Sequence, residues 1–83
     1  MYMSEYPPMV SIRDLGLASA LVTAGFEIED INRSTDGRTS SIFQVTIPLN
    51  EAVNGYYADK LHVKARKFFD NIKMLKSRIH SES

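Results

Sequence analysis

The pattern of apolar and polar residues changes several times along the chain. Residues 12–24 are apolar at most positions, which predicts a helix that is buried on more than one side. Ser11 is the predicted N-cap of this helix, and Gly25, which readily adopts a positive φ, is predicted to end it. Residues 1–9 contain Pro7-Pro8 and predict a flexible, extended arm before the folded part.

The next part of the chain has the pattern of a β-hairpin. Residues 26–33 alternate until Ile31, where the change of phase predicts a β-bulge near Glu29-Asp30. An Asp-Gly pair predicts the turn within a loop over 34–39, and the return strand is predicted over 41–47. Two faces of the return strand are predicted: Phe43, Val45 and Ile47 share one, and Ile42, Gln44 and Thr46 share the other.

Pro48 ends the predicted strand, and two helices are predicted to follow it. Asn50 is the predicted N-cap of a short helix over 51–58. A long helix over 63–80 is predicted to precede a frayed tail at 81–83, and its apolar residues recur at helical spacing: Ala65, Phe68, Phe69, Ile72, Leu75 and Ile79. Basic residues flank this stripe and cover the opposite face: Lys64, Arg66, Lys67, Lys73, Lys76 and Arg78.

These elements predict one α+β domain over residues 1–83, with a folded core over 10–80. A small antiparallel β-sheet, formed by the central hairpin, is expected to carry the buried N-terminal helix and the long amphipathic C-terminal helix on one face. A sheet of this kind needs a third strand for stability. The residues around 9–10, the segment 61–63 or a second subunit are the possible sources of that strand.

Composition narrows the class of protein. The 83 residues include ten basic and ten acidic side chains and no cysteine, which suits a globular domain and excludes a disulfide scaffold, a thiolate metal site and a cysteine nucleophile. His62 and His80 have no partner at metal-ligand spacing. Glu27 and Glu29 point the same way and could hold a hard cation, but a solvated strand face is the favoured interpretation. No nucleophile or nucleotide-binding motif is present. We therefore expect no enzymatic activity, no cofactor, no metal and no membrane contact, and a cytoplasmic location.

Charge is distributed unevenly. Residues 1–50 carry three basic against six acidic side chains, whereas residues 51–83 carry seven basic against four acidic ones. A basic amphipathic helix can neutralise phosphates, so the leading candidates for nucleic-acid binding are Lys64, Arg66, Lys67, Lys73, Lys76 and Arg78, with Arg38 in the hairpin loop as an added contact. The alternative is that these cations only keep the helix soluble and cover its apolar seam.

A strip of small residues in the first helix is the second candidate surface. Gly16, Ala20 and Ala24 recur every four residues, which allows another backbone to approach closely. The strip predicts self-association into a homodimer. The alternative is that it packs against the final helix of the same chain.

Several short motifs together resemble a family of small uncharacterised proteins of phages, prophages and other mobile elements. They are Asp14-Leu15-x-Leu17-Ala18-x-x-Leu21 leading to Gly25-Phe26, Gly37-Arg38 before Phe43-x-Val45, Tyr57, and Val63-x-Ala65-Arg66-x-Phe68-Phe69 leading to Lys73-x-Leu75-Lys76-Ser77-Arg78-Ile79. The resemblance implies a source and a fold more than a function. Such proteins are commonly accessories that bind DNA or RNA, or inhibitors that bind a host protein such as a defence nuclease, as anti-CRISPR proteins do.

Overall fold

The computed structural model describes residues 7–81. Its elements are β1 (Met9–Ile12), α1 (Leu15–Thr23), β2 (Asp30–Arg33), β3 (Thr39–Gln44), α2 (Ile47–Tyr57) and α3 (Ala65–Ser81). The predicted α+β class is confirmed. Most of the predicted flexible arm (residues 1–6) and the last two residues of the predicted frayed tail lie outside the described residues, while Ser81 still belongs to α3.

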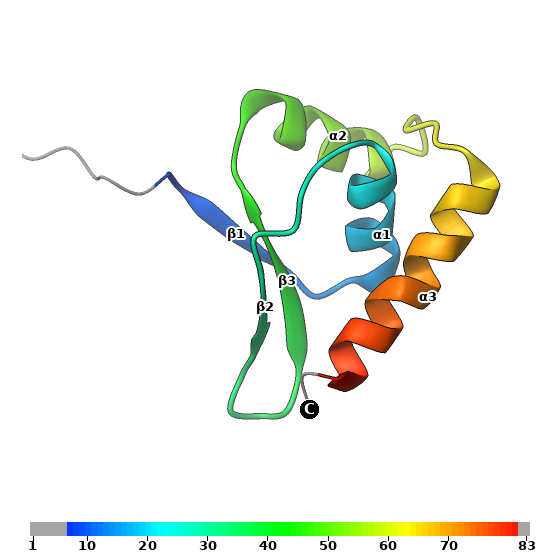
Figure 1. Ribbon diagram of the computed structural model, residues 1–83. Helices are drawn as coiled ribbons and strands as arrows, with labels where there is room; N and C mark the ends of the chain where they lie inside the picture. Colours follow the sequence, from blue (N-terminus) through cyan, green and yellow to red (C-terminus); the bar gives the residue numbers. More distant parts are fainter. Residues whose placement is uncertain (1–6, 82–83) are drawn as a thin grey trace, which may run out of the picture.

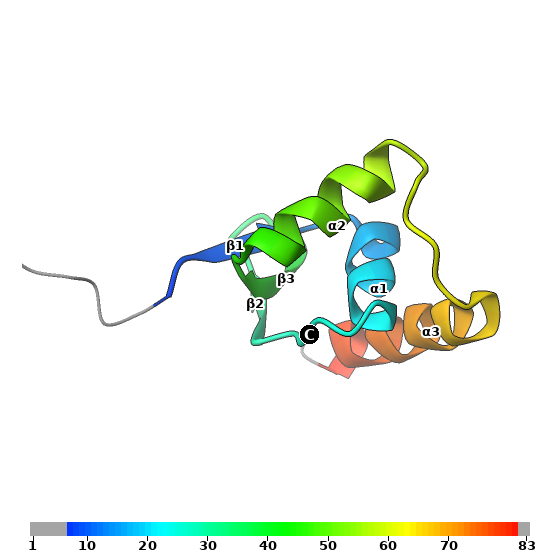
Figure 2. The same cartoon turned by 90° about the horizontal axis from the view of Figure 1, so that it is seen from above.

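The three strands form one antiparallel sheet in the order β1-β3-β2. The third strand is therefore supplied by the N-terminal arm, where Val10 pairs with Phe43, and this is one of the three predicted sources. The helices lie on one side of the sheet, with α1 between the sheet and α3 (Figure 1). Viewed from above, α1 also lies between α2 and α3, and it contacts both (Figure 2).

The predicted bulge and turn of the hairpin are confirmed. The Glu29 N–H donates to the Ile42 carbonyl at 2.7 Å, although Asp30 is the residue that pairs with Ile42, so two residues oppose one as in a β-bulge. Gly37 has a φ of +85° in the turn that follows β2. The regular part of β2 begins only at Asp30, after the bulge, and is shorter than the predicted strand over 26–33.

The first helix begins three residues later than predicted. Asp14, not Ser11, is its N-cap, and the Asp14 carboxylate accepts the Leu17 N–H at 3.1 Å. Ser11 instead lies in β1, paired with Ile42. The predicted end at Gly25 is confirmed by its φ of +110° and by the hydrogen bond from the Phe26 N–H to the Leu21 carbonyl, which close the helix in the manner of a Schellman motif.

The second helix begins four residues earlier than predicted. Thr46 is its N-cap and accepts the Leu49 N–H at 3.1 Å, so Asn50 lies inside the helix. Pro48 occupies the first turn, where no intrahelical N–H bond is lost. The predicted strand over 41–47 therefore ends at Gln44, and Ile47, predicted to lie on a strand face with Phe43, belongs to α2 and is 75% exposed.

The core lies between the sheet and the helices. Phe43 of β3 is fully buried, together with Leu21 of α1, Leu49 of α2 and Leu75 of α3. The long helix nearly matches its predicted range of 63–80. Its predicted apolar stripe is wider than the buried seam: the structure leaves Ala65 and Phe69 exposed and Phe68, Ile72 and Ile79 half-buried.

Candidate nucleic-acid interface

The basic residues of α3 are all exposed, as is Lys64 directly before the helix. A helix turns by about 100° per residue, so residues three, four or seven positions apart lie on the same side. Three cations, one aromatic residue and the acid Asp70 share the side of α3 that faces away from the buried Leu75. We name this side the outer face and define it by Arg66, Phe69, Lys73 and Lys76.

Two other cations lie on a flank of α3. Lys67 and Arg78 are eleven residues apart, about three helical turns, and therefore lie along one line. Lys67 borders a hollow of ≈ 510 Å³ together with Ala24 and Lys64, and Arg78 borders one of ≈ 390 Å³ together with Glu27. Both hollows adjoin the end of α1. The predicted cations therefore form two surfaces, and not a single one.

The outer face remains positively charged because it has little internal compensation. Within residues 7–81, Lys73 is the only one of the six cations with a carboxylate within ion-pair distance, and the Lys73 Nζ lies 3.9 Å from Asp70 Oδ1. Both side chains are more than half exposed, and ion pairs of this kind contribute little to stability. The carboxylates of the hairpin do not pair with these cations in the described part of the chain. The positive charge of these residues is therefore largely uncompensated within residues 7–81.

The first turn of α3 departs from the usual charge pattern of helices. Asp14 caps α1 and Thr46 caps α2, but Lys64, which has no acceptor atom, precedes α3. The first turn of α3 contains Arg66 and Lys67 and no acid. Positive charge at a helix N-terminus opposes the helix dipole, typically by about 0.3–1 kcal/mol per charge. Helix stability alone does not explain these cations, and a local conflict of this kind is typical of functional surfaces.

Arg38 lies apart from the other predicted contacts. Its guanidinium Nε is 3.8 Å from Asp36 Oδ2 at the hairpin tip, and both side chains are exposed. Hydrogen bonds from the Ser34 hydroxyl and the Arg38 N–H lower the pKa of Asp36 from its ordinary value. Both views place the hairpin tip far from the first turn of α3 (Figures 1 and 2). The structure therefore does not bring Arg38 together with the N-terminal cations of the helix.

The strip of small residues is largely covered by the chain itself. A Cβ at Gly16 would lie 2.7 Å from the Tyr56 hydroxyl of α2, and Ala20 is 2% exposed, whereas Ala24 is exposed. Partial burial and the nearby Asp14 carboxylate raise the pKa of Tyr56. The element that approaches Gly16 closely is thus α2. The alternative prediction, in which the final helix packs on the strip, does not hold at this residue. Self-association through this strip stays a prediction.

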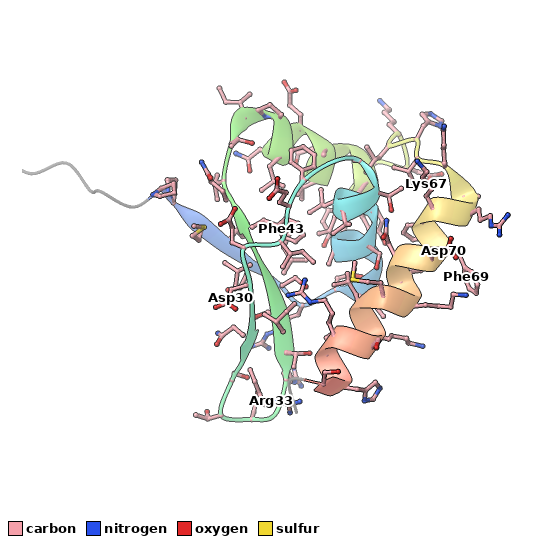
Figure 3. The ribbon with its side chains drawn as sticks, viewed as in Figure 1. Asp30, Arg33, Phe43, Lys67, Phe69 and Asp70 are labelled. Atoms are coloured by element: carbon pink, nitrogen blue, oxygen red, sulfur yellow. The ribbon has the colours of Figure 1, made fainter. Side chains whose placement is uncertain are left out.

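Phe69 is the residue of the outer face whose exposure was not predicted. It was expected in the buried stripe, but its side chain is 58% exposed and projects away from α1 (Figure 3). The Lys73 ammonium lies 4.9 Å from the centroid of its ring. A signal was present in the sequence: adjacent helical residues point about 100° apart, so Phe68 and Phe69 cannot both face a narrow seam.

Other chemistry has little support in residues 7–81. They contain no group of three or more His, Asp or Glu side chains placed to hold a metal ion. None of the helices described there combines the length and the apolar character that a membrane span requires.

The fold and the outer face together define a small α+β domain with a cationic helix that has one exposed aromatic ring. Comparison with protein families assigns the domain further. The chain belongs to the family described as a domain of unknown function, DUF5659, whose model matches residues 9–81. No curated protein and no solved structure matches the chain significantly. The family description names no source, so an origin in phages or mobile elements stays a prediction.

Proposed function

We propose that this chain is a small non-enzymatic module that binds nucleic acid through the outer face of α3. The observation that supports the proposal most is the set of exposed and almost unpaired cations on one helix of a chain with zero formal net charge. Cations on a solvated surface are usually interspersed with acids, but Asp70 is the only acid in α3. The resemblance to small proteins of phages and mobile elements agrees with this role.

Binding of nucleic acid through these cations should weaken as the salt concentration rises. Each phosphate that a cation neutralises releases counterions, so the logarithm of the binding constant falls with the logarithm of the salt concentration by about 0.9 per phosphate on duplex DNA and about 0.7 on single strands. The three cations of the outer face therefore predict a slope of about −3 on duplex DNA and about −2 on single strands. Contacts from Lys67 or Arg78 on the flank would steepen the slope.

A charge-matched pair of variants tests the location of the binding surface. We expect Lys73→Gln/Lys76→Gln to weaken binding and to make the salt slope shallower by about 2, measured by titration of labelled DNA from about 50 mM salt upward. Arg13→Gln/Lys60→Gln removes the same charge from exposed positions outside α3 and should leave the slope nearly unchanged. Equal losses in the two variants, or no binding of the parent at low salt, would contradict the proposal.

A second candidate function is that of a protein-protein interaction module, such as a dimeric inhibitor of a host defence protein. One observation favours it: the Tyr57 side chain is 67% exposed at the rim of a hollow of ≈ 430 Å³ that Leu61 and Phe68 also line. An aromatic side chain beside a partly apolar hollow is a common anchor point for a partner protein. This surface differs from the small-residue strip, which was predicted for self-association.

Copurification from a host lysate with the parent and with Tyr57→Ser tests the second candidate. A protein partner should be retained by the parent and lost by the variant. Light scattering of the purified chain tests whether the module is a dimer, because a strict monomer at high concentration would contradict this. Loss of the same partner after nuclease treatment would indicate that nucleic acid, and not protein contact, had held it.

A further inference from the structure

Phe69 gives the outer face a feature that phosphate binding alone does not require. Its ring is 58% exposed and lies in the middle of the cationic sector, with Arg66 one turn before it and Lys73 one turn after it. In Figure 3 the Phe69 side chain points into solvent on the side of α3 that faces away from α1. It is also absent from the hydrophobic core cluster, so the fold does not account for an aromatic residue at this position.

The groups around the ring limit what it can bind. The Lys73 ammonium lies 4.9 Å from the ring centroid, a distance at which a cation is attracted to the ring face. Lys76 is seven residues after Phe69 and therefore lies on the same side of the helix, about 10 Å further along it. The Lys73 ammonium lies over one face of the ring, so a planar ligand would stack on the other face. Cations on both sides of the ring then fit a ligand whose planar rings are joined by anionic groups.

A second copy of this helix does not fit that description. Two outer faces placed against each other would bring Arg66, Lys73 and Lys76 close to the same cations of the other copy, and like charges at short distance repel. A duplex fits only in part. Its bases are stacked inside the helix, and a phenylalanine ring has no hydrogen-bonding group with which to read base edges in a groove.

We infer that the outer face takes single-stranded nucleic acid, with one base stacked on Phe69 and the backbone phosphates next to Arg66, Lys73 and Lys76. This inference rests on the function proposed above and adds the strand class to it. Stacking on an aromatic ring tolerates any base, because each base has a flat face. Preference for single strands is therefore expected without strong preference for sequence.

The test compares a labelled oligo(dT) of about 12 nucleotides with a duplex of the same length, in fluorescence anisotropy titrations of the full chain. Phe69→Leu keeps the apolar character but removes the ring, and it should weaken oligo(dT) binding by about 5- to 150-fold, the range that one base–aromatic stack contributes. Binding of the duplex should change little. Phe69→Tyr keeps the ring and should bind like the parent, and thermal melting should show that all three proteins are equally folded.

The outcomes separate this inference from the function on which it rests. If the parent binds the duplex as well as oligo(dT), and Phe69→Leu changes neither affinity, binding by the cations stands and the single-strand inference is overturned. If the parent binds neither oligonucleotide at low salt, both proposals fail. Vesicles containing an anionic phospholipid complete the test. Loss of vesicle binding in Phe69→Leu, with unchanged binding of oligo(dT), would assign the ring to a lipid surface and overturn the inference.

Discussion

The helices α1 and α3 lie against each other but are built in opposite ways. Five of the nine residues of α1 are buried, and none of the nine is charged. In α3, Leu75 is the only buried residue among seventeen, and five residues are Lys or Arg. The reason is position: α1 lies between the sheet and the other two helices, whereas α3 contacts the rest of the molecule mainly along one seam with α1.

This difference indicates where function can be sought. Almost every side chain of α1 is constrained by packing, so its small and apolar residues are explained by the fold. Most side chains of α3 are free of that constraint, and their charge and the exposed Phe69 need another explanation. A polar link joins the two helices: the Asn71 amide donates to Thr23 Oγ1 at 2.9 Å, while the Thr23 hydroxyl donates to the Ser19 carbonyl.

The largest effect is expected from shortening a side chain in α1. Leu21→Ala should lower the free energy of unfolding by about 2–5 kcal/mol, because Leu21 is fully buried and its removal leaves a cavity. Phe69→Ala in α3 should change it by less than about 0.5 kcal/mol, because the Phe69 ring is mostly in solvent. Urea denaturation of both variants measures the contrast. Similar losses in the two proteins would show that α3 is as enclosed as α1.

A substitution at the end of α1 is expected to have the next largest effect. Gly25→Ala should cost about 1–2 kcal/mol, because Gly25 has a φ of +110° and L-residues resist this region. Nothing lies within 4 Å of the added Cβ, so the whole cost would come from the backbone. Gly55→Ala in α2 is the matched control and should raise stability by about 0.5–1 kcal/mol, since its Cβ would make only ordinary contacts. Thermal unfolding should show the two changes with opposite signs.

The polar link between the helices is expected to contribute less. Thr23→Val keeps the shape of the side chain but removes the acceptor for the Asn71 amide, and it should cost about 1 kcal/mol. The double variant Thr23→Val/Asn71→Leu should recover part of this loss, because no half-buried amide is then left without its partner. If the double variant loses more stability than the two single variants lose together, the link is not a simple hydrogen bond.

The smallest effect is expected far from both helices, at the hairpin tip. Hydrogen bonds from Ser34 and Arg38 lower the pKa of Asp36 in the folded state below its ordinary value of 3.8. The ionised Asp36 therefore stabilises the fold above that value, and this contribution is lost as the pH falls through the lowered pKa. Asp36→Asn should accordingly be less stable than the parent at neutral pH, and the two should converge in acid. Thermal melts across that pH range check the convergence, and a constant difference would contradict the assignment.

Local patterns predicted the parts of the fold that depend on neighbouring residues. The turn at Gly37, the end of α1 at Gly25 and the bulge at Glu29-Asp30 each follow from a few adjacent residues, and all three are confirmed. The hydrophobic period predicted both ends of α3 to within two residues. The exposure of its cations was also predictable, because long charged side chains are rarely buried without a partner.

The starts of α1 and α2 were not predictable in the same way. Ser11 and Asp14 are both suitable N-caps, and so are Thr46 and Asn50, so local chemistry allows two starting points for each helix. Strand pairing decided between them for α1. Residues 9–12 complete the sheet beside β3, and the first helix can begin only after that strand ends.

The sequence by itself determined the α+β class, the hairpin and a long helix with one apolar and one cationic side. The tertiary structure decided how much of the apolar side is used. Only α1 packs extensively against α3, and a seam with a single helix is narrow, so it encloses Leu75 and leaves Phe69 in solvent between cations. Hydrophobic period reports which residues can face a core, but the width of the core depends on the neighbouring elements that cover it.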